Sequence, residues 1–143
     1  MPRFLLLALT VGITIPIVAC SPKKETSLET VVVETLISAT ESWNGDSFRY
    51  PRGKAEMKLE KITAQPNFKT PVHLHPQPGI IYVQKGTIFC ETSDGKSLTV
   101  TAGESFASSQ GTAHYCENNG DEEMVVFVAS AGTKGKRTTV SAE

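Results

Sequence analysis

The sequence predicts an all-β domain, a sandwich or barrel of short antiparallel strands, from three observations. Stretches rich in β-branched and aromatic residues recur at short intervals, and Gly, Pro, Asn and Asp separate them. None of these stretches is long enough for a stable helix. The dipeptide Asp94-Gly95, between β-prone flanks, is a strong hairpin signal. We expect the sheet to close or to pair with a second one, because closure removes exposed strand edges.

Strands are expected in seven places along the chain. Residues 31–37 and 57–64 are rich in β-branched or apolar residues, and 124–129 is a nearly unbroken apolar run. Tight turns are expected at 102–103 and 118–121. The complete set of expected strands is 31–37, 57–64, 80–83, 87–92, 98–100, 113–117 and 124–129.

Composition is that of one soluble globular domain, with 143 residues, 39% hydrophobic and 20% charged. The formal charge of -1 and the lack of a basic run interleaved with aromatic residues exclude a nucleic-acid partner. The basic cluster Lys134–Arg137 lies in a stretch rich in Gly and Thr. We therefore expect the β domain to occupy residues 30–131, followed by a flexible, solvated tail at 132–143.

The N-terminus carries an export signal, residues 1–19. Arg3 is followed by an apolar run at 4–18 that is too short, and too interrupted by Gly and Pro, for a comfortable membrane span. The sequence Ile17-Val18-Ala19-Cys20 resembles the bacterial lipobox; a plain secretory signal is the alternative. The resemblance implies lipidation of Cys20, a tether at 20–29 and a lipid-anchored protein of the cell envelope. By resemblance to sorting rules, Ser21 favours the outer membrane, facing the periplasm, in a Gram-negative source.

The three histidines of the chain fall in two places, His73-Leu74-His75 and His114. Neutral imidazole is the commonest metal ligand, and strand side chains two residues apart point to the same face. These three residues are therefore candidate ligands of a divalent metal. Hydrogen-bonded structural histidines are the alternative.

The spacing around these histidines resembles the two motifs of the cupin family, small jelly-roll barrels in which each motif supplies metal ligands. The resemblance spans about 57–129 and implies a jelly-roll fold and a bound metal ion. The segments 42–45 and 50–53 are similar to the N-terminal arm of a group of single-domain cupins, and cupins often dimerise through such arms, so a homodimer is possible. The first motif, G-x5-H-x-H-x3,4-E-x6-G, is matched by His73, His75 and Gly86, with Asn67 at its first position; the second, G-x5-P-x-G-x2-H-x3-N, is matched by Gly103, Gly111, His114 and Asn118, with Ser109 in place of Pro.

The chain departs from the family at the carboxylate ligand, where it has Gly79 or, under the longer spacing, Ile80. Three histidines without a carboxylate leave a divalent metal its full charge and open positions. This ligand set resembles that of the cupin-type thiol dioxygenases. Zinc bound by three histidines and a water is an equally well-known arrangement. The sequence does not decide between Fe, Zn, Ni and Mn. Gln77 is a candidate weak ligand or hydrogen-bond partner of a bound water, or simply a loop residue between two prolines.

Cys90 and Cys116 are candidates for a disulfide, the default outside the cytoplasm. The alternative is that a free thiol lines the pocket, where Cys116 would share the inward face of His114. Tyr82 is a candidate pocket wall, since it lies near the histidines in sequence.

The predicted function is that of a metal-dependent, dioxygenase-like enzyme acting on a small molecule. No general acid or base stands out, because Glu91, Glu104 and Glu117 fall at positions expected to face solvent. A non-catalytic module that binds a metal or a small ligand at the cell envelope is the main alternative, and a purely structural domain is the third.

Overall fold

The computed structural model describes residues 31–142. The chain divides into two units, Met1–Val33 and Glu34–Glu143. The expected signal peptide, Cys20 and the tether lie outside the described residues. Between residues 31 and 142 the structure holds no helix with the length and apolar character needed to cross a bilayer.

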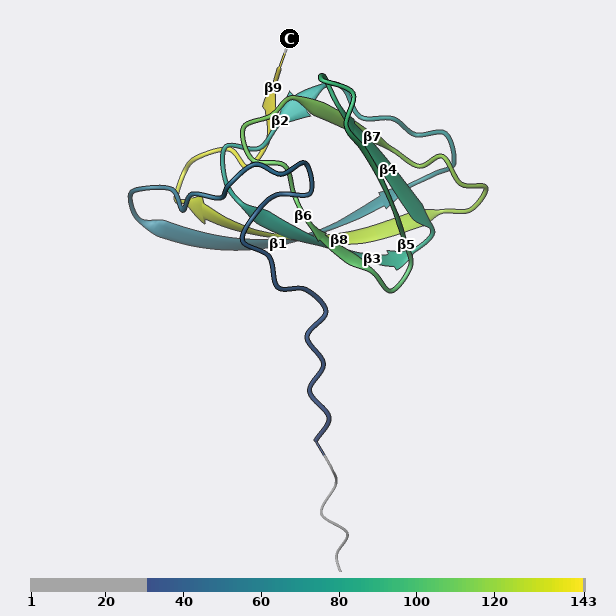
Figure 1. The fold of residues 1–143 in the computed structure, drawn as a ribbon, viewed down its shortest axis with the longest axis horizontal. Helices are drawn as coiled ribbons and strands as arrows, with labels where there is room; N and C mark the ends of the chain where they lie inside the picture. The colour runs from purple at the N-terminus through teal and green to yellow at the C-terminus, as the bar shows by residue number, and fades with distance from the viewer. Residues whose placement is uncertain (1–30, 143) are drawn as a thin grey trace, which may run out of the picture. The chain divides into compact units, whose positions relative to one another are not determined.

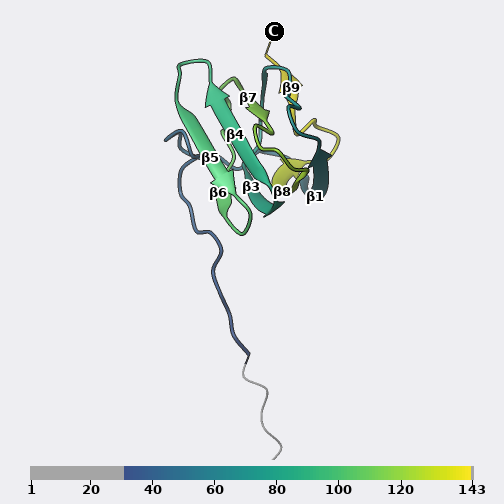
Figure 2. The same ribbon diagram turned by 90° about the vertical axis from the view of Figure 1, so that its right-hand side faces the viewer.

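The second unit is built from antiparallel strands in two sheets, which confirms the predicted all-β jelly-roll class. One sheet has the order β1-β8-β3-β6 and the other β5-β4-β7-β2-β9. Figures 1 and 2 show them as two layers, with β1, β8 and β3 in one and β4, β7 and β9 in the other. The strands are β1 (Ala55–Ala64), β2 (His73–Leu74), β3 (Gly79–Lys85), β4 (Thr87–Thr92), β5 (Ser97–Thr101), β6 (Ser105–Ala107), β7 (His114–Glu117), β8 (Met124–Thr133) and β9 (Val140–Ser141).

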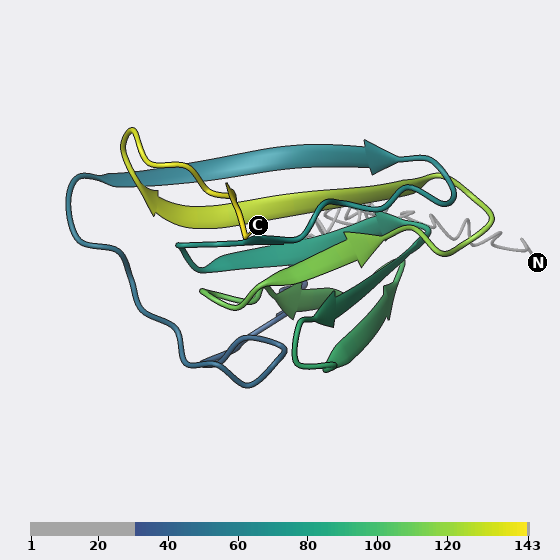
Figure 3. The same ribbon diagram turned by 90° about the horizontal axis from the view of Figure 1, so that it is seen from above.

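The core lies between the two sheets and follows the period-2 alternation of the strands. In β3, the side chains of Ile81 and Val83 are buried between the two sheets. Ile80 precedes Ile81, points to the outer face of its sheet and is exposed. In β8, Val126 is buried on the same inner side. Figure 3 shows β1 and β8 side by side as two long strands, and they pair along their whole length from Ala55 opposite Thr133 to Ala64 opposite Met124. The predicted hairpin is confirmed, since β4 and β5 pair on either side of the Asp94-Gly95 turn.

Residues 31–37 do not form the expected strand. This segment has no regular secondary structure, and Val31, Val32 and Val33 are more than 80% exposed. β-branched residues favour a strand only when a neighbouring strand pairs with them and buries one face. Here no pairing partner is recorded for the segment within the described chain, so its composition alone does not produce a strand.

Residues of the expected tail also take part in both sheets. Residues 132–133 end β8, and Val140 pairs with Leu74 so that β9 covers the edge of β2. Further on, the Ala142 amide donates to the Val72 carbonyl at 3.3 Å. Backbone hydrogen bonds to an open strand edge hold this polar segment in place, and they leave little trace in side-chain composition.

The arm before β1 docks on the same domain. The Trp43 amide donates to the Ala107 carbonyl at 3.0 Å, and the Trp43 side chain packs against the core. The side-chain amide of Gln110 makes two hydrogen bonds with the backbone of Arg49. Its Oε1 accepts from the Arg49 amide at 2.8 Å, and its Nε2 donates to the Arg49 carbonyl at 2.9 Å. The arm thereby braces the loop that leads into β7.

Candidate metal centre

The three histidines meet in space. His73 of β2 lies directly opposite His114 of β7 in the sheet, and His75 follows β2 in an isolated bridge to Gln110. One ring nitrogen of each histidine lies within 4.8 Å of a ring nitrogen of the other two. Ring centroids are 4.5 Å apart for His73 and His114, and 5.1 Å from each of these to His75. The sequence prediction that the two motifs form one cluster is confirmed.

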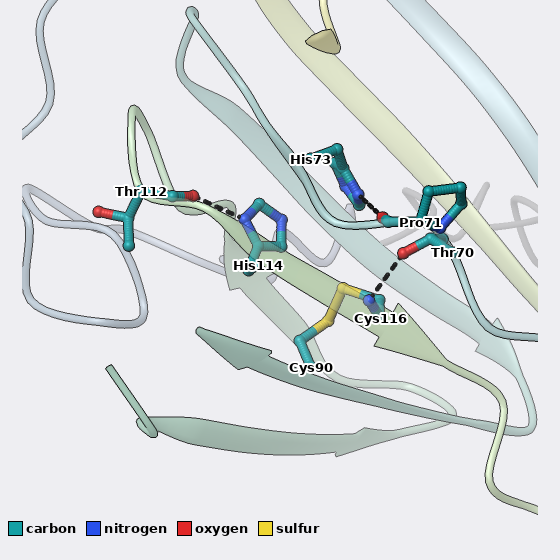
Figure 4. The surroundings of a disulfide bond; sticks show 7 residues. All are labelled: Thr70, Pro71, His73, Cys90, Thr112, His114 and Cys116. Carbon is teal, nitrogen blue, oxygen red and sulfur yellow. Dashed lines mark hydrogen bonds between the residues drawn. A yellow bond between two sulfur atoms is a disulfide. The ribbon is translucent and has the colours of Figure 1, made fainter. Parts of the chain in front are cut away.

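Each histidine has its Nδ1 against a backbone carbonyl. The Nδ1 of His73 lies 2.8 Å from Pro71 O, and that of His114 lies 2.9 Å from Thr112 O (Figure 4). The Nδ1 of His75 lies 3.0 Å from Thr138 O. A carbonyl oxygen only accepts, so each Nδ1 carries the proton and each Nε2 keeps its lone pair. Metal-binding histidines are commonly oriented in this way.

Burial keeps two of the imidazoles neutral. It lowers the pKa of His75 below its ordinary value, although the Thr138 carbonyl partly opposes this. For His114, burial is again the main cause and lowers the pKa to about 4. At neutral pH both rings therefore offer a lone pair rather than a second proton.

The cluster opens into a cavity of about 640 Å³, within the size range of small-molecule sites. His73 and His75 form part of its wall. The remaining wall combines apolar side chains with polar ones. The apolar lining includes Ile62, Phe68, Val72, Ile81, Ile88, Met124, Val126 and Val128, and the polar lining includes Gln77, Ser108 and Ser130.

The position of the missing carboxylate is an inward-facing glycine. Gly79 lines the cavity, whereas Ile80 points outward and is 43% exposed. A Cβ at Gly79 would lie 3.0 Å from Ser108 Oγ and 3.1 Å from the Ala129 carbonyl, so a longer side chain would require these neighbours to shift. The donor set is therefore three imidazole nitrogens. Such a set fits a divalent transition metal, which binds imidazole readily.

The other predicted pocket residues divide between the cavity and the rest of the barrel. Gln77 is 4% exposed and lines the cavity, as does Cys116. Tyr82 does not line it, because it alternates with the inward residues Ile81 and Val83 and so lies on the outer face of the sheet. Proximity in sequence to the histidines is a poor guide here, since the period-2 alternation decides the face.

Cys90 and Cys116 form the expected disulfide. They lie directly opposite each other on β4 and β7, with their Cα atoms 4.1 Å apart. Figure 4 shows the bond two residues along β7 from His114. Cys90 is 1% exposed and belongs to the core rather than to the cavity wall. The crosslink excludes the alternative of a free thiol at the site.

Sequence reasoning missed several groups of the cavity wall. Glu60 and Glu117 line the cavity, although Glu117 also lies 3.5 Å from the Lys69 ammonium. Thr138 and Thr139 come from the segment predicted to be a flexible tail. The alternation of β7 predicts Glu117 to be outward, and no motif marks the threonines, so the sequence carries no signal for these positions.

The family model described as the cupin domain matches residues 61–130 of this chain. No curated protein matches this chain significantly. Solved structures with the same fold are similar to it at low identity. The DMSP lyase DddQ from Ruegeria pomeroyi DSS-3 is 15% identical, with a TM-score of 0.53, over 60% of this chain and 43% of that one.

Two further structures extend the comparison. The polyketide cyclase RemF from Streptomyces resistomycificus is 21% identical, with a TM-score of 0.52, over 64% of this chain and 63% of its own. An oxalate oxidase in complex with the substrate analogue glycolate is 26% identical, with a TM-score of 0.50, over 60% of this chain and 46% of its own. This chain spans less than two thirds of each of these proteins.

Proposed function

We propose that the chain is a metal-dependent enzyme acting on a small molecule, with dioxygenase-like chemistry. The support is its match to the cupin domain model and the convergence of its three histidines beside a cavity. The observation that carries the proposal is the orientation of the three rings. Each Nδ1 is bound to a carbonyl, so three Nε2 lone pairs remain for one ion. His73, His75 and His114 would hold iron, zinc, nickel or manganese.

The residues around the cluster would orient the ligands and exclude water. A bound divalent metal supplies Lewis acidity or, for iron and manganese, redox chemistry. The carbonyls of Pro71, Thr112 and Thr138 fix the three rings, and the apolar part of the wall offers a surface for the apolar part of a ligand. Since no carboxylate occupies position 79, the chain would supply three imidazole ligands to a bound ion, and a small molecule from the cavity would supply a further one.

The structural neighbours support a small-molecule substrate. The DMSP lyase, the polyketide cyclase and the oxalate oxidase all act on small molecules, as their names state. The cavity volume of about 640 Å³ suits a ligand of this size.

The first experiment measures metal content and oxygen consumption. We expect about one equivalent of metal per chain by plasma mass spectrometry after reconstitution with iron, zinc, nickel or manganese in turn. The iron-loaded protein should consume oxygen with one member of a panel of thiols, phenols and diketones. Well under one equivalent with every metal would refute the site.

A non-catalytic binding module is the second candidate. It is favoured by the pairing of both carboxylates of the cavity wall with lysines, Glu117 with Lys69 at 3.5 Å and Glu60 with Lys58 at 4.0 Å. Stoichiometric metal binding without oxygen consumption above that of free iron would support this module over the enzyme.

We also propose export and lipid anchoring at Cys20. The support comes from the lipobox-like sequence 17–20 and from the Cys90–Cys116 bond, since disulfides persist in oxidising compartments outside the cytoplasm. In a bacterial host, we expect incorporation of a labelled fatty acid that Cys20→Ser abolishes. Labelling that survives in the variant would refute the anchor.

A homodimer is a further proposal. The outer face of the β1-β8-β3-β6 sheet exposes Met57, Leu59 and Ile80, with exposed fractions of 75%, 69% and 43%. Apolar patches of this kind commonly mark interfaces. Sedimentation velocity should show a dimer that Leu59→Glu dissociates, whereas a monomeric wild type would refute the proposal.

A further inference from the structure

A second hollow adjoins the metal cavity on the side of His75. The Thr138 carbonyl and the Thr139 hydroxyl, which lie 3.0 and 3.2 Å from His75 Nδ1, belong to residues that line both hollows. The second hollow is therefore continuous with the cavity wall at the third candidate ligand. The residues shared by the two are Glu60, Ile62, Thr138 and Thr139, and the second hollow adds Lys58, Lys61 and Arg137.

The basic cluster Lys134–Arg137 is brought to this hollow by the turn that follows β8. Within the turn, the Lys136 amide donates to the Thr133 carbonyl at 2.9 Å. The Lys134 amide donates to the Lys54 carbonyl at 2.8 Å, so the turn lies beside the start of β1 (Figure 3). The last residue of the cluster thereby joins the two lysines of β1 in one hollow.

The second hollow carries an excess of positive charge. Three cationic side chains line it, Lys58, Lys61 and Arg137, together with the Glu60 carboxylate. The Glu60 carboxylate lies 4.0 Å from the Lys58 ammonium, and these side chains are 46% and 39% exposed. Among the described residues, neither Lys61 nor Arg137 forms an ion pair. Cationic groups without a countercharge therefore stand beside the cavity.

The opposite end of the cavity border is apolar. Ile62, Phe68 and Val72 line the cavity and are 44%, 48% and 38% exposed. Ile62 follows Lys58 by four residues on the same face of β1, so the two ends lie roughly 13 Å apart along this strand. Because β1 is an edge strand of its sheet, this row of side chains forms a border of the cavity that changes from cationic to apolar.

We propose that Lys58, Lys61 and Arg137 bind a singly charged anionic group of the ligand, such as a carboxylate, while the apolar body of the ligand packs in the cavity. Guanidinium and ammonium groups both donate hydrogen bonds to a carboxylate, and such charge-assisted bonds are stronger than neutral ones. The Glu60 carboxylate in the same hollow disfavours a doubly charged group. The inference rests on the proposed function in that it names the ligand class of the same cavity.

The test compares three probes that share one apolar body, 4-phenylbutanoate, 4-phenylbutanamide and 4-phenylbutylamine. Their affinities for the purified protein are measured by ligand-observed NMR after metal removal with a chelator, so that no metal ion attracts the carboxylate. At low salt we expect the carboxylate to bind about 5-fold more tightly than the amide, the upper range for exposed ion pairs, and the amine to bind most weakly. The carboxylate-to-amide ratio should fall toward one at about 0.5 M NaCl, because salt screens exposed charges.

Variants assign the preference to particular side chains. Arg137→Gln and Lys58→Gln should each lower the carboxylate-to-amide ratio about twofold, and the double variant should bring it close to one. Affinity for the uncharged amide should stay unchanged in these variants, which separates a loss of charge from a loss of structure. The matched control is Lys85→Gln, because it removes the same charge at a residue that lines neither hollow. This control should keep the wild-type ratio.

Four outcomes would overturn the inference. These are equal affinities of the carboxylate and the amide for wild type, a ratio that does not respond to salt, an unchanged ratio in the double variant, and no binding of any probe. Thermal unfolding of each variant verifies that it is folded before the ratios are compared. A failed metal reconstitution with the carboxylate preference intact would refute the proposed function alone, whereas stoichiometric metal with equal probe affinities would refute only the inference.

Discussion

The three histidines reach the same orientation by two different routes. His73 and His114 are opposite neighbours in the sheet, and each Nδ1 is bound by the carbonyl two residues before it. His75 lies beyond the end of β2, and its Nδ1 is bound by Thr138, 63 residues away. The first pair thus depends on strand register, whereas the third ligand depends on the docking of residues 137–141.

The site therefore has one part that is held by strand pairing and another part that is held only by the C-terminal segment. The Cys90–Cys116 crosslink lies on the side of the register-bound pair, because Cys116 is two residues from His114. The His75 side is held by hydrogen bonds to the C-terminal segment, and the same segment binds Gln77 through Arg137 O. Changes to the first part should alter the fold together with the site, whereas changes to the second should alter mainly the site.

The largest effect is expected from removing a ligand of the register-bound pair. Either His73→Ala or His114→Ala should abolish stoichiometric metal, with affinity lowered by more than about 100-fold, because a lost ligand costs more than a lost supporting contact. Metal content is measured by plasma mass spectrometry after reconstitution. Tyr82→Phe, on the outer face, is the control. Retention of about one equivalent in both histidine variants would contradict the site.

The disulfide comes next, and its effect should fall on stability. Replacing both Cys90 and Cys116 by Ser should lower the free energy of unfolding by about 3–4 kcal/mol, as the chain-entropy relation gives for a sequence separation of 26. Denaturant unfolding measures this change. Metal affinity should fall much less, since the β4–β7 ladder remains. An unaltered unfolding midpoint would show that the crosslink does not constrain the unfolded chain.

The buried His114 predicts a pH dependence of the metal-free protein. Its folded pKa of about 4 lies below the ordinary value of 6.5, so between these values the unfolded chain binds a proton that the folded chain does not. Stability is therefore fully present above pH 6.5 and falls as the pH drops toward 4, by an amount on the order of 3 kcal/mol. Unfolding free energies of wild type and His114→Gln are compared across this range. Carboxylate protonation affects both proteins equally. If the two unfolding free energies change in parallel with pH, the pH dependence does not come from His114.

The smallest effect on metal binding is expected from the part of the site that is held by the C-terminal segment. Ending the chain after Lys136 removes the Thr138 carbonyl from His75 and should lower zinc affinity by about 10- to 100-fold, the range seen for supporting contacts of metal ligands. Competition with a chromogenic chelator measures this affinity. Thr139→Ala removes only the hydroxyl 3.2 Å from His75 Nδ1 and should have a milder effect. Zinc affinity equal to that of wild type in the truncated chain would mean that His75 needs no such anchor.

The features predicted from the sequence are those governed by local pattern. The Asp94-Gly95 hairpin follows from turn chemistry. The shared inward face of His114 and Cys116, two residues apart on one strand, follows from the period-2 alternation of side chains. The histidine spacing brings the two motifs together once the barrel forms. These predictions needed no knowledge of which distant segments meet.

The features that could not be predicted depend on backbone contacts between distant segments. The order of residues 134–142 comes from hydrogen bonds to an exposed strand edge, which any side chains allow. The same holds for the Thr138 carbonyl at His75. Residues 31–37 show the converse, because strong β propensity without a recorded partner strand gave no strand.

The position of Thr138 has a consequence for biogenesis. A ribosome makes His75 63 residues before the carbonyl that orients it. A domain in which residues 137–141 have not yet docked keeps His73 opposite His114 but lacks the carbonyl that holds the third imidazole. Docking of this C-terminal segment is therefore the step that completes the orientation of all three rings.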